Sequence, residues 1–196
     1  MTNRPLSVAV IGLGFVGMPL SLSYAMRGAH VVGVDVMAGY VEEINAGISH
    51  HQEYHEGRSL AEILREQLAA GRFRATTSYR EAAAETDHYI ITVGIPIVNG
   101  DPDLSALRAC CTELSKVLKR GDTVVLRSTV IPGTTEDVVL PLLEEAAARE
   151  RDRAPAATAG LPQFSDDELA ALIHETPEQI EVVFQPQHDL ASNQIA

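Results

Sequence analysis

Three glycines near the N-terminus have a spacing that can bind a phosphate. Gly12, Gly14 and Gly17 form the pattern G-x-G-x-x-G. The first glycine of such a pattern permits a tight turn, the second lets a pyrophosphate approach the backbone, and the third lets a helix pack closely on a sheet. A helix that begins there presents unpaired N–H groups and the positive end of its dipole to the phosphates. The three glycines therefore predict a dinucleotide site.

An acidic residue, Asp35, stands 18 residues after Gly17, at the end of an apolar run. A carboxylate at that place can accept hydrogen bonds from both hydroxyls of the adenosine ribose. It would also repel a 2′-phosphate by roughly 1 kcal/mol or more when partly desolvated. No Arg or Lys lies between Asp35 and Gly57 to receive that phosphate. The sequence thus predicts NAD, rather than NADP, as the cofactor.

These residues need regular elements to position them. The apolar run 8–11 precedes the glycines, a helical segment at 18–28 follows them, and a second apolar run at 30–35 ends in the acid. A second half begins with a buried strand at 88–93 and a turn at Gly94, Ile95 and Pro96, and continues with a helix at 104–118 and a strand at 122–126. This alternation predicts an α/β fold, a Rossmann-like doubly wound parallel sheet with the strand order 3-2-1-4-5-6. Ligands bind at the carboxyl ends of the strands in such a sheet.

The remaining segments predict shorter elements. We expect helices at 40–46, 59–70 and 79–85, a strand at 73–76, a helix from 134 to about 149, a short helix at 165–173 and a sixth strand at 179–184. Pro141 has no N–H to donate, so the helix that contains it should be kinked there. The NAD-binding domain is expected to span residues 1–149. Residues 150–196 are expected to form a linker, the short helix and the strand that completes the sheet.

The composition argues against several kinds of partner. The 196 residues carry 27 acidic and 15 basic side chains, a net charge of -12, which argues against nucleic acid and an anionic membrane surface. No apolar run approaches the roughly 18 residues that span a membrane, so no membrane span is expected. The stretch before the first strand is too short and polar to be a signal peptide. We expect a cytoplasmic protein without a structural disulfide, because the two cysteines are adjacent.

Histidines and cysteines offer two further kinds of site. His50, His51 and His55 lie beside acidic residues, as metal ligands do, but no helix or strand spacing gathers them on one face. We therefore expect a solvated loop at 48–58 and no metal site. Cys111 falls on the apolar side of its helix, so we interpret it as a small core residue rather than a catalytic thiol.

Three motifs resemble those of one enzyme family. They read VIGLGFVGMPL at 10–20, GDPDLS at 100–105 and STVIPGTT at 128–135. The motifs and their spacing are similar to those of the UDP-glucose/GDP-mannose dehydrogenase family, and the resemblance covers residues 6–147. Enzymes of this family oxidise the C6 alcohol of a nucleotide sugar to a carboxylate, with two NAD molecules and a covalent thioester on a cysteine. The resemblance thus implies a dehydrogenase that uses NAD.

The resemblance implies a role for each matching residue. The pyrophosphate would be held by Gly12, Gly14, Phe15, Val16 and Gly17, and the adenosine ribose by Asp35. The cofactor cleft would be lined by Gly94, Ile95 and Pro96. Ser128 and Thr129 would lie by the nicotinamide, where Thr129 would help to position the catalytic water, because a hydroxyl can donate and accept at once. The alternative for Thr129 is a strand-end residue that hydrogen-bonds the backbone.

The sequence also departs from the family pattern. A hydroxyl, a basic residue and two acids are usual at four positions that here hold Ile95, Tyr40, Arg127 and Gln187. The sequence stops where the family's long connecting helix would begin. We therefore expect the dimerisation domain, the nucleotide-sugar domain and the catalytic cysteine to be missing from it.

Three hypotheses about function remain open. The chain is the NAD-binding half of a UDP-hexose type 6-dehydrogenase, which works with a partner chain or is cut from a longer one. Alternatively, it is a stand-alone NAD-binding or regulatory module without dehydrogenase activity. A third hypothesis is a small dehydrogenase of altered specificity that uses a partner's substrate site. The motifs favour the first hypothesis as an account of the chain's ancestry. The substitutions and the missing domains favour the second hypothesis as an account of its present activity.

Overall fold

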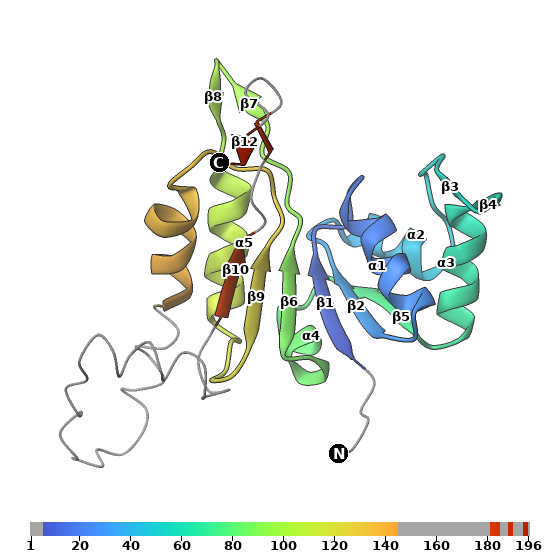
Figure 1. The fold of residues 1–196 in the computed structure, drawn as a ribbon. Helices are drawn as coiled ribbons and strands as arrows, with labels where there is room; N and C mark the ends of the chain where they lie inside the picture. Colours follow the sequence, from blue (N-terminus) through green and yellow to red (C-terminus); the bar gives the residue numbers. More distant parts are fainter. Residues whose placement is uncertain (1–5, 145–180, 185–187, 190–193, 196) are drawn as a thin grey trace, which may run out of the picture.

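A six-stranded parallel sheet forms the centre of the protein (Figure 1). The computed structural model describes residues 6–144, 181–184, 188–189 and 194–195. The strands of the sheet are β1 (Ser7–Ile11), β2 (His30–Val34), β5 (Phe73–Thr76), β6 (His88–Ile91), β9 (Thr123–Leu126) and β10 (Glu181–Phe184). Their order across the sheet is β5-β2-β1-β6-β9-β10, which is 3-2-1-4-5-6 when the six are numbered along the chain. The predicted fold class and strand order are confirmed.

Alternating side chains on each strand give the sheet two apolar faces. On β1, Val8 and Val10 face one side, while Ala9 and Ile11 face the other. The first face is covered by α1 (Gly17–Met26), α2 (Ala38–Asn45) and α3 (Leu60–Ala69). The second face is covered by α4 (Tyr79–Glu85), α5 (Ser105–Ser115) and the π-helical segment η1 (Thr135–Val139). Helices on both faces make this a doubly wound sheet. No helix in the described part of the chain is long and apolar enough to cross a membrane.

Local signals placed several elements where the structure has them. Ser59 caps α3: its side chain accepts from the Glu62 N–H, and the Glu62 side chain accepts from the Ser59 N–H, which together form a capping box. The strand β5 and the helix α4 have the predicted bounds. Cys111 is fully buried on α5, so its interpretation as a core residue is confirmed.

Two short hairpins lie in segments for which no strand was predicted. In the first, β3 (Tyr54–His55) pairs with β4 (Arg58–Ser59), and in the second, β7 (Ile97–Val98) pairs with β8 (Asp101–Pro102). Each turns through two residues of positive φ, Glu56 and Gly57 in one and Asn99 and Gly100 in the other, which is the geometry that two-residue hairpins favour. The β7–β8 hairpin rises above the carboxyl ends of the strands (Figure 1). A further pair joins β11 (His188–Asp189) to β12 (Gln194–Ile195).

The irregularity expected at Pro141 takes the form of a π-helical turn. The Leu140 N–H donates to the Thr135 carbonyl, five residues back, and η1 ends just before the proline. The residues from 140 to 144 continue as α-helix. The rest of this predicted helix, the helix expected at 165–173 and the boundary expected at residue 149 lie outside the described residues.

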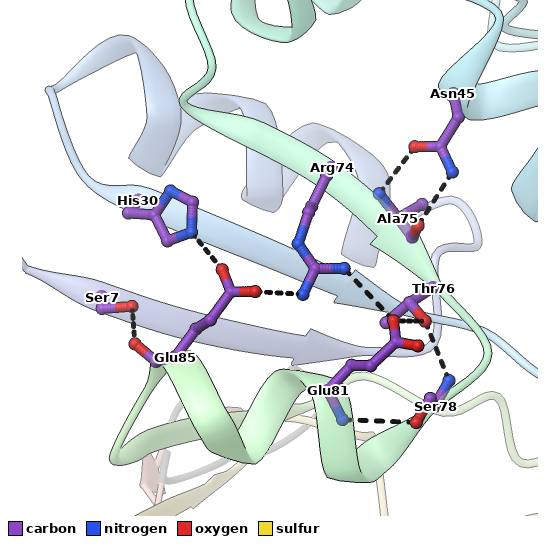
Figure 2. A network of polar contacts seen from close by, with 9 residues as sticks. All are labelled: Ser7, His30, Asn45, Arg74, Ala75, Thr76, Ser78, Glu81 and Glu85. Atoms are coloured by element: carbon purple, nitrogen blue, oxygen red, sulfur yellow. Dashed lines mark hydrogen bonds and ion pairs between the residues drawn. The ribbon is translucent and has the colours of Figure 1, made fainter.

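A polar network ties the amino ends of β1 and β2 and the edge strand β5 to α4 (Figure 2). The Glu85 carboxylate contacts the His30 ring at 2.6 Å and pairs with the Arg74 guanidinium. The Arg74 and His30 hydrogen bonds lower the pKa of Glu85. Beside this cluster, Asn45 of α2 accepts from the Ala75 N–H at 2.9 Å and donates to the Ala75 carbonyl at 2.8 Å. Asn45 thereby satisfies the hydrogen-bonding groups of Ala75 on the side of the edge strand that no other described strand pairs.

Candidate functional site

Two cavities meet at the carboxyl ends of the central strands. The first, of about 410 Å³, lies between the glycine loop, the end of β2 and the helices α4 and α5. The second, of about 530 Å³, lies beside the segment that follows β9. Thr92, Val93 and Gly94 line both, so the cavities adjoin along the chain segment that follows β6. Their position is where ligands bind in an open α/β sheet.

The three glycines of the loop do different physical work. Gly12 has φ +92°, and an added Cβ would lie 3.2 Å from backbone atoms of Thr92 and Val93. A Cβ on Gly17 would lie 1.8 Å from the Gly12 carbonyl oxygen, so no other residue fits there without moving the backbone. A Cβ on Gly14 would meet nothing within 4 Å. Gly14 therefore borders open space, as a loop that admits a ligand requires.

Backbone N–H groups hold Asp35 at the edge of the first cavity. One carboxylate oxygen accepts from the Leu13 N–H at 2.9 Å, and the other accepts from the Met37 N–H at 3.0 Å. Each oxygen of a carboxylate has a second lone pair. Asp35 can therefore accept two further hydrogen bonds, such as those from the hydroxyls of a ribose, without losing its own support.

Thr92 links the two halves of the sheet behind the glycine loop. Its hydroxyl lies 2.7 Å from the Gly12 carbonyl and 3.0 Å from that of Ile11, and its N–H donates to the Ile11 carbonyl at 2.8 Å. From the sequence, Thr92 is predicted only as part of a buried strand. It is the one hydroxyl in the run 88–93 that is not on an aromatic ring, and a lone hydroxyl in a buried run is a signal that could have marked it.

The predicted site residues that follow β9 all line the second cavity, and one of them also hydrogen-bonds the backbone beside it. Thr129 is exposed and lines the second cavity with Ile95 and Arg127. Ser128 also lines it, and its hydroxyl donates to the Val93 carbonyl at 2.7 Å. The alternative interpretation of Thr129, as a residue that hydrogen-bonds the backbone, therefore describes its neighbour Ser128.

The other predicted site residues are distributed as follows. Gly12, Gly14 and Asp35 line the first cavity, Val16 lines the second, and Gly94 lines both. Phe15, Gly17 and Pro96 line neither of them. The Pro96 carbonyl instead accepts from the Asp103 N–H at 2.8 Å, at the base of the β7–β8 hairpin.

The helices α4 and α5 contribute cavity residues that the sequence analysis missed. Tyr79, Ala106, Ala109 and Cys110 all line the first cavity. Burial, followed by the neighbouring Cys110, raises the pKa of Tyr79, so its hydroxyl stays protonated at neutral pH. These residues come from the far face of the sheet, and an amphipathic pattern alone does not show which helix residues border a ligand.

The histidine loop differs from the prediction in one respect. His50 is exposed and its ring lies 2.9 Å from the Glu43 carboxylate, as expected of a solvated loop. The prediction is wrong for His51, whose side chain is only 6% exposed. Its ring packs edge-on against Phe15 of the glycine loop, with 5.7 Å between the ring centroids. Within the described ranges, no group of three His, Cys, Asp or Glu side chains is arranged to hold a metal ion.

Residues 6–184 match the family model of the UDP-glucose/GDP-mannose dehydrogenase family, NAD binding domain. The chain belongs to this family. The part of the family that it matches is the NAD-binding domain, which confirms NAD as the cofactor. The departures from the family pattern expected at Ile95, Tyr40 and Arg127 stay predictions, and Gln187 lies outside the described residues.

Relatives of the UDP-glucose/GDP-mannose dehydrogenase family match the same region. The GDP-mannose 6-dehydrogenase of Pseudomonas syringae pv. tomato is 38% identical over 147 residues, which are 73% of this chain and 33% of the relative. The crystal structure of GDP-mannose dehydrogenase from Pseudomonas aeruginosa has a TM-score of 0.66 at 36% identity, over 72% of this chain and 32% of that one. A UDP-glucose dehydrogenase from Pyrobaculum islandicum has a TM-score of 0.66 at 37% identity, over 74% and 34%. The chain thus spans about a third of the length of the curated relatives it matches.

Proposed function

We propose that NAD lies across the two cavities, with its adenosine ribose at Asp35 and its nicotinamide beside Thr129. The observation that carries this proposal is that the cavities adjoin at Thr92–Gly94, with Asp35 on the first and Thr129 on the second. The pyrophosphate would then lie over Gly14, where the loop has open space, and against the first turn of α1. Phe15, Val16 and Gly17 would present backbone N–H groups to it, and Gly94, Ile95 and Ser128 would border the nicotinamide end.

We further propose that the chain is the NAD-binding part of a nucleotide-sugar 6-dehydrogenase. NAD would accept hydride from the C6 carbon of the sugar, and the exposed Thr129 hydroxyl would position the water needed for the second oxidation. The relatives include proteins named for GDP-mannose and for UDP-glucose, so the proposed substrate class is a nucleotide sugar of either base, rather than a UDP-hexose alone.

The nucleophile and the sugar site would come from a polypeptide beyond these 196 residues. Cys110 and Cys111 are buried, with exposed fractions of 4% and 0%, so neither thiol is placed to form a covalent bond to a sugar. The relatives are about three times as long as the matched region. A partner chain, or a longer form of this one, would therefore complete the site. The proposal places the reaction in the cytoplasm, where the two free thiols stay reduced.

Calorimetric titration of the chain with NAD and NADP tests the cofactor site. We expect NAD to bind with a Kd between micromolar and millimolar and NADP to bind at least about tenfold more weakly, because Asp35 would face the 2′-phosphate. Equal binding of both cofactors would contradict the placement of Asp35 at the ribose.

A second measurement tests whether the chain needs another polypeptide for turnover. The chain alone, incubated with NAD and either GDP-mannose or UDP-glucose, should produce no NADH. Addition of a polypeptide that carries a sugar site and an exposed cysteine should restore NADH formation. Turnover by the chain alone would overturn the proposal, and NAD binding without turnover in any such mixture would favour a stand-alone NAD-binding module.

A further inference from the structure

The loop between α2 and β3 folds back against the glycine loop at His51. The His51 ring packs edge-on against Phe15, and its Nε2 lies 3.3 Å from the Tyr40 hydroxyl. The Tyr40 hydroxyl lies 2.9 Å from the Leu13 carbonyl. Leu13 is itself fully buried, and its N–H is held by Asp35. His51 therefore reaches the glycine loop by two routes, one through the Phe15 ring and one through Tyr40.

The hydrogen-bond directions in this cluster are fixed by chemistry. The Leu13 carbonyl can only accept, so the Tyr40 hydroxyl donates its proton there. The Tyr40 oxygen then accepts from the Nε2–H of His51. Burial, followed by the charges of Asp35 and Glu43, raises the pKa of Tyr40, so this hydroxyl keeps the proton it donates.

The remaining ring nitrogen of His51 has no hydrogen-bond partner. Nδ1 is buried, and the carboxylate of Glu53 lies 3.8 Å from it, beyond hydrogen-bond distance. A buried polar atom without a partner carries a free-energy cost that a purely structural residue would not need to bear. A leucine or phenylalanine would fill the same place without that cost.

We propose that His51 is a positioning residue for cofactor binding, which fixes the glycine loop through Phe15 and Tyr40. This inference rests on the proposed placement of NAD in the adjoining cavities. Phe15 follows Gly14 and is 84% exposed as a residue, so the His51 ring is a contact that restrains an otherwise exposed side chain. A restrained Phe15 keeps its peptide N–H directed toward the pyrophosphate, which lowers the entropic cost of binding.

The position of Tyr40 supports the same assignment. The tyrosine hydroxyl is used to hold the Leu13 carbonyl, between Gly12 and Gly14. The Leu13 peptide is thus held from both sides, by Asp35 at its N–H and by Tyr40 at its carbonyl. His51 supports the second of these two restraints.

Calorimetric NAD titration of three single variants tests the proposal. His51→Ala should weaken NAD binding by roughly 2- to 12-fold, the range expected for one lost aromatic contact. His51→Phe keeps a ring against Phe15 but loses the hydrogen bond to Tyr40, so it should recover only part of this loss. His50→Ala is the matched control: its ring is exposed and pairs only with Glu43 among the contacts described, so NAD binding should not change.

Two further measurements separate positioning from a merely structural role. The melting temperature of each variant without NAD reports on folding alone, and it should not rank the variants as NAD affinity does. The double variant Phe15→Ala with His51→Ala should bind NAD less weakly than the sum of the two single losses predicts, because His51 acts partly through that ring and partly through Tyr40.

The outcomes distinguish this inference from the proposed function. If wild type binds NAD and His51→Ala binds it equally well, the inference is wrong while the cofactor site stands. If His51→Phe is as weak as His51→Ala, or the Phe15 and His51 effects simply add, the route through Phe15 is wrong. If wild type does not bind NAD at millimolar cofactor, both the cofactor site and this inference are overturned.

Discussion

The cavities at the carboxyl ends of the strands and the polar network between α4 and the strands β1, β2 and β5 (Figure 2) are built on contrasting principles. At the carboxyl ends, two cavities adjoin, and apolar side chains such as Phe15, Ile97 and Ile131 are exposed around them. In the polar network, each charged side chain of Figure 2 has a partner on another element. The cavity region leaves side chains available to a ligand, whereas the polar network pairs its charged side chains within the protein.

This contrast indicates that binding and stability reside in different parts of the molecule. Polar groups that are paired within the protein contribute to the free energy of unfolding but offer nothing to a ligand. Glycines that border open space, and a carboxylate such as Asp35 that can accept further hydrogen bonds, serve ligand binding rather than the free energy of unfolding. Substitutions in the two regions should therefore change NAD affinity and melting temperature separately.

The largest effect should come from Gly17→Ala. The added methyl would lie 1.8 Å from the Gly12 carbonyl oxygen, so the loop and α1 must move apart. We expect NAD binding to be lost and the free energy of unfolding to fall by about 3 kcal/mol or more, since the overlap is with backbone rather than with a flexible side chain. Calorimetry and chemical denaturation measure the two changes.

Two other glycines sharpen this test. Gly14→Ala adds a methyl to open space, so stability should not change while NAD binding falls sharply. Gly39→Ala, in α2, also adds a methyl to open space but lies away from the cavities and should leave NAD affinity unchanged. If Gly14→Ala destabilised the fold as much as Gly17→Ala, the two functions of the loop would not be separable.

The next largest effect should come from Asp35. Asp35→Ala removes the acceptor for the N–H groups of Leu13 and Met37 as well as the proposed ribose contact. Hydrogen bonds to a charged group contribute about 1.5–3 kcal/mol, so NAD should bind roughly 10- to 150-fold more weakly. Asp35→Arg should shift the preference toward NADP. An unchanged preference in a competitive titration would mean that residue 35 is not at the ribose.

Asn45→Ala should show the opposite profile. It removes two hydrogen bonds from the backbone of the edge strand β5 and should lower the free energy of unfolding by roughly 1–2 kcal/mol. The melting temperature should fall by a few degrees, about 2–4 °C per kcal/mol for a chain of this size. NAD affinity should be unchanged. Thr112→Ala on the exposed side of α5 is the control, and a loss of NAD affinity in Asn45→Ala would break the comparison.

The smallest effect should be the pH dependence of Glu85. The hydrogen bonds from Arg74 and His30 lower its pKa in the folded state, so its stabilising contribution is complete above the unfolded pKa of about 4.3. It is lost as the pH falls through the lower folded pKa. Because the side chain is 36% exposed, the contribution should stay below about 1 kcal/mol.

Denaturation of Glu85→Gln at neutral and acid pH measures this contribution. The variant should be slightly less stable than wild type at pH 7, and the difference should shrink toward acid. Glu42→Gln, an exposed acid of α2, supplies the control for a simple change of net charge. A difference between wild type and Glu85→Gln that grew toward acid would contradict the sign of the pKa shift.

Local signals allowed much of the fold to be predicted. The capping box at Ser59 and Glu62 and the alternating residues at 73–76 act within a few residues, so sequence alone placed α3 and β5. The glycine spacing and Asp35 predicted the first cavity for the same reason. The hairpins were missed because each of their strands is only two residues long, too short to show an alternating pattern.

The remaining site features depend on contacts between distant segments. His51 is buried and contacts Phe15, and no periodicity joins those two positions. Tyr79 and Cys110 border the first cavity because α4 and α5 cross the far face of the sheet. Residues of this kind become visible only when the elements are packed, since their chemistry is set by tertiary neighbours.

The link between Thr92 and Gly12 has a consequence for how the protein is made. These residues are 80 positions apart, so the loop lacks this restraint until the second half of the sheet has been synthesised. At the usual rate of translation, about 5–20 residues per second, this interval lasts roughly 4–16 s. The strand β5 is complete at Thr76, 16 residues before Thr92, so β1, β2 and β5 can pair for roughly 1–3 s before Thr92 is added. The nascent chain would thus acquire half of its sheet before it acquires a finished cofactor loop.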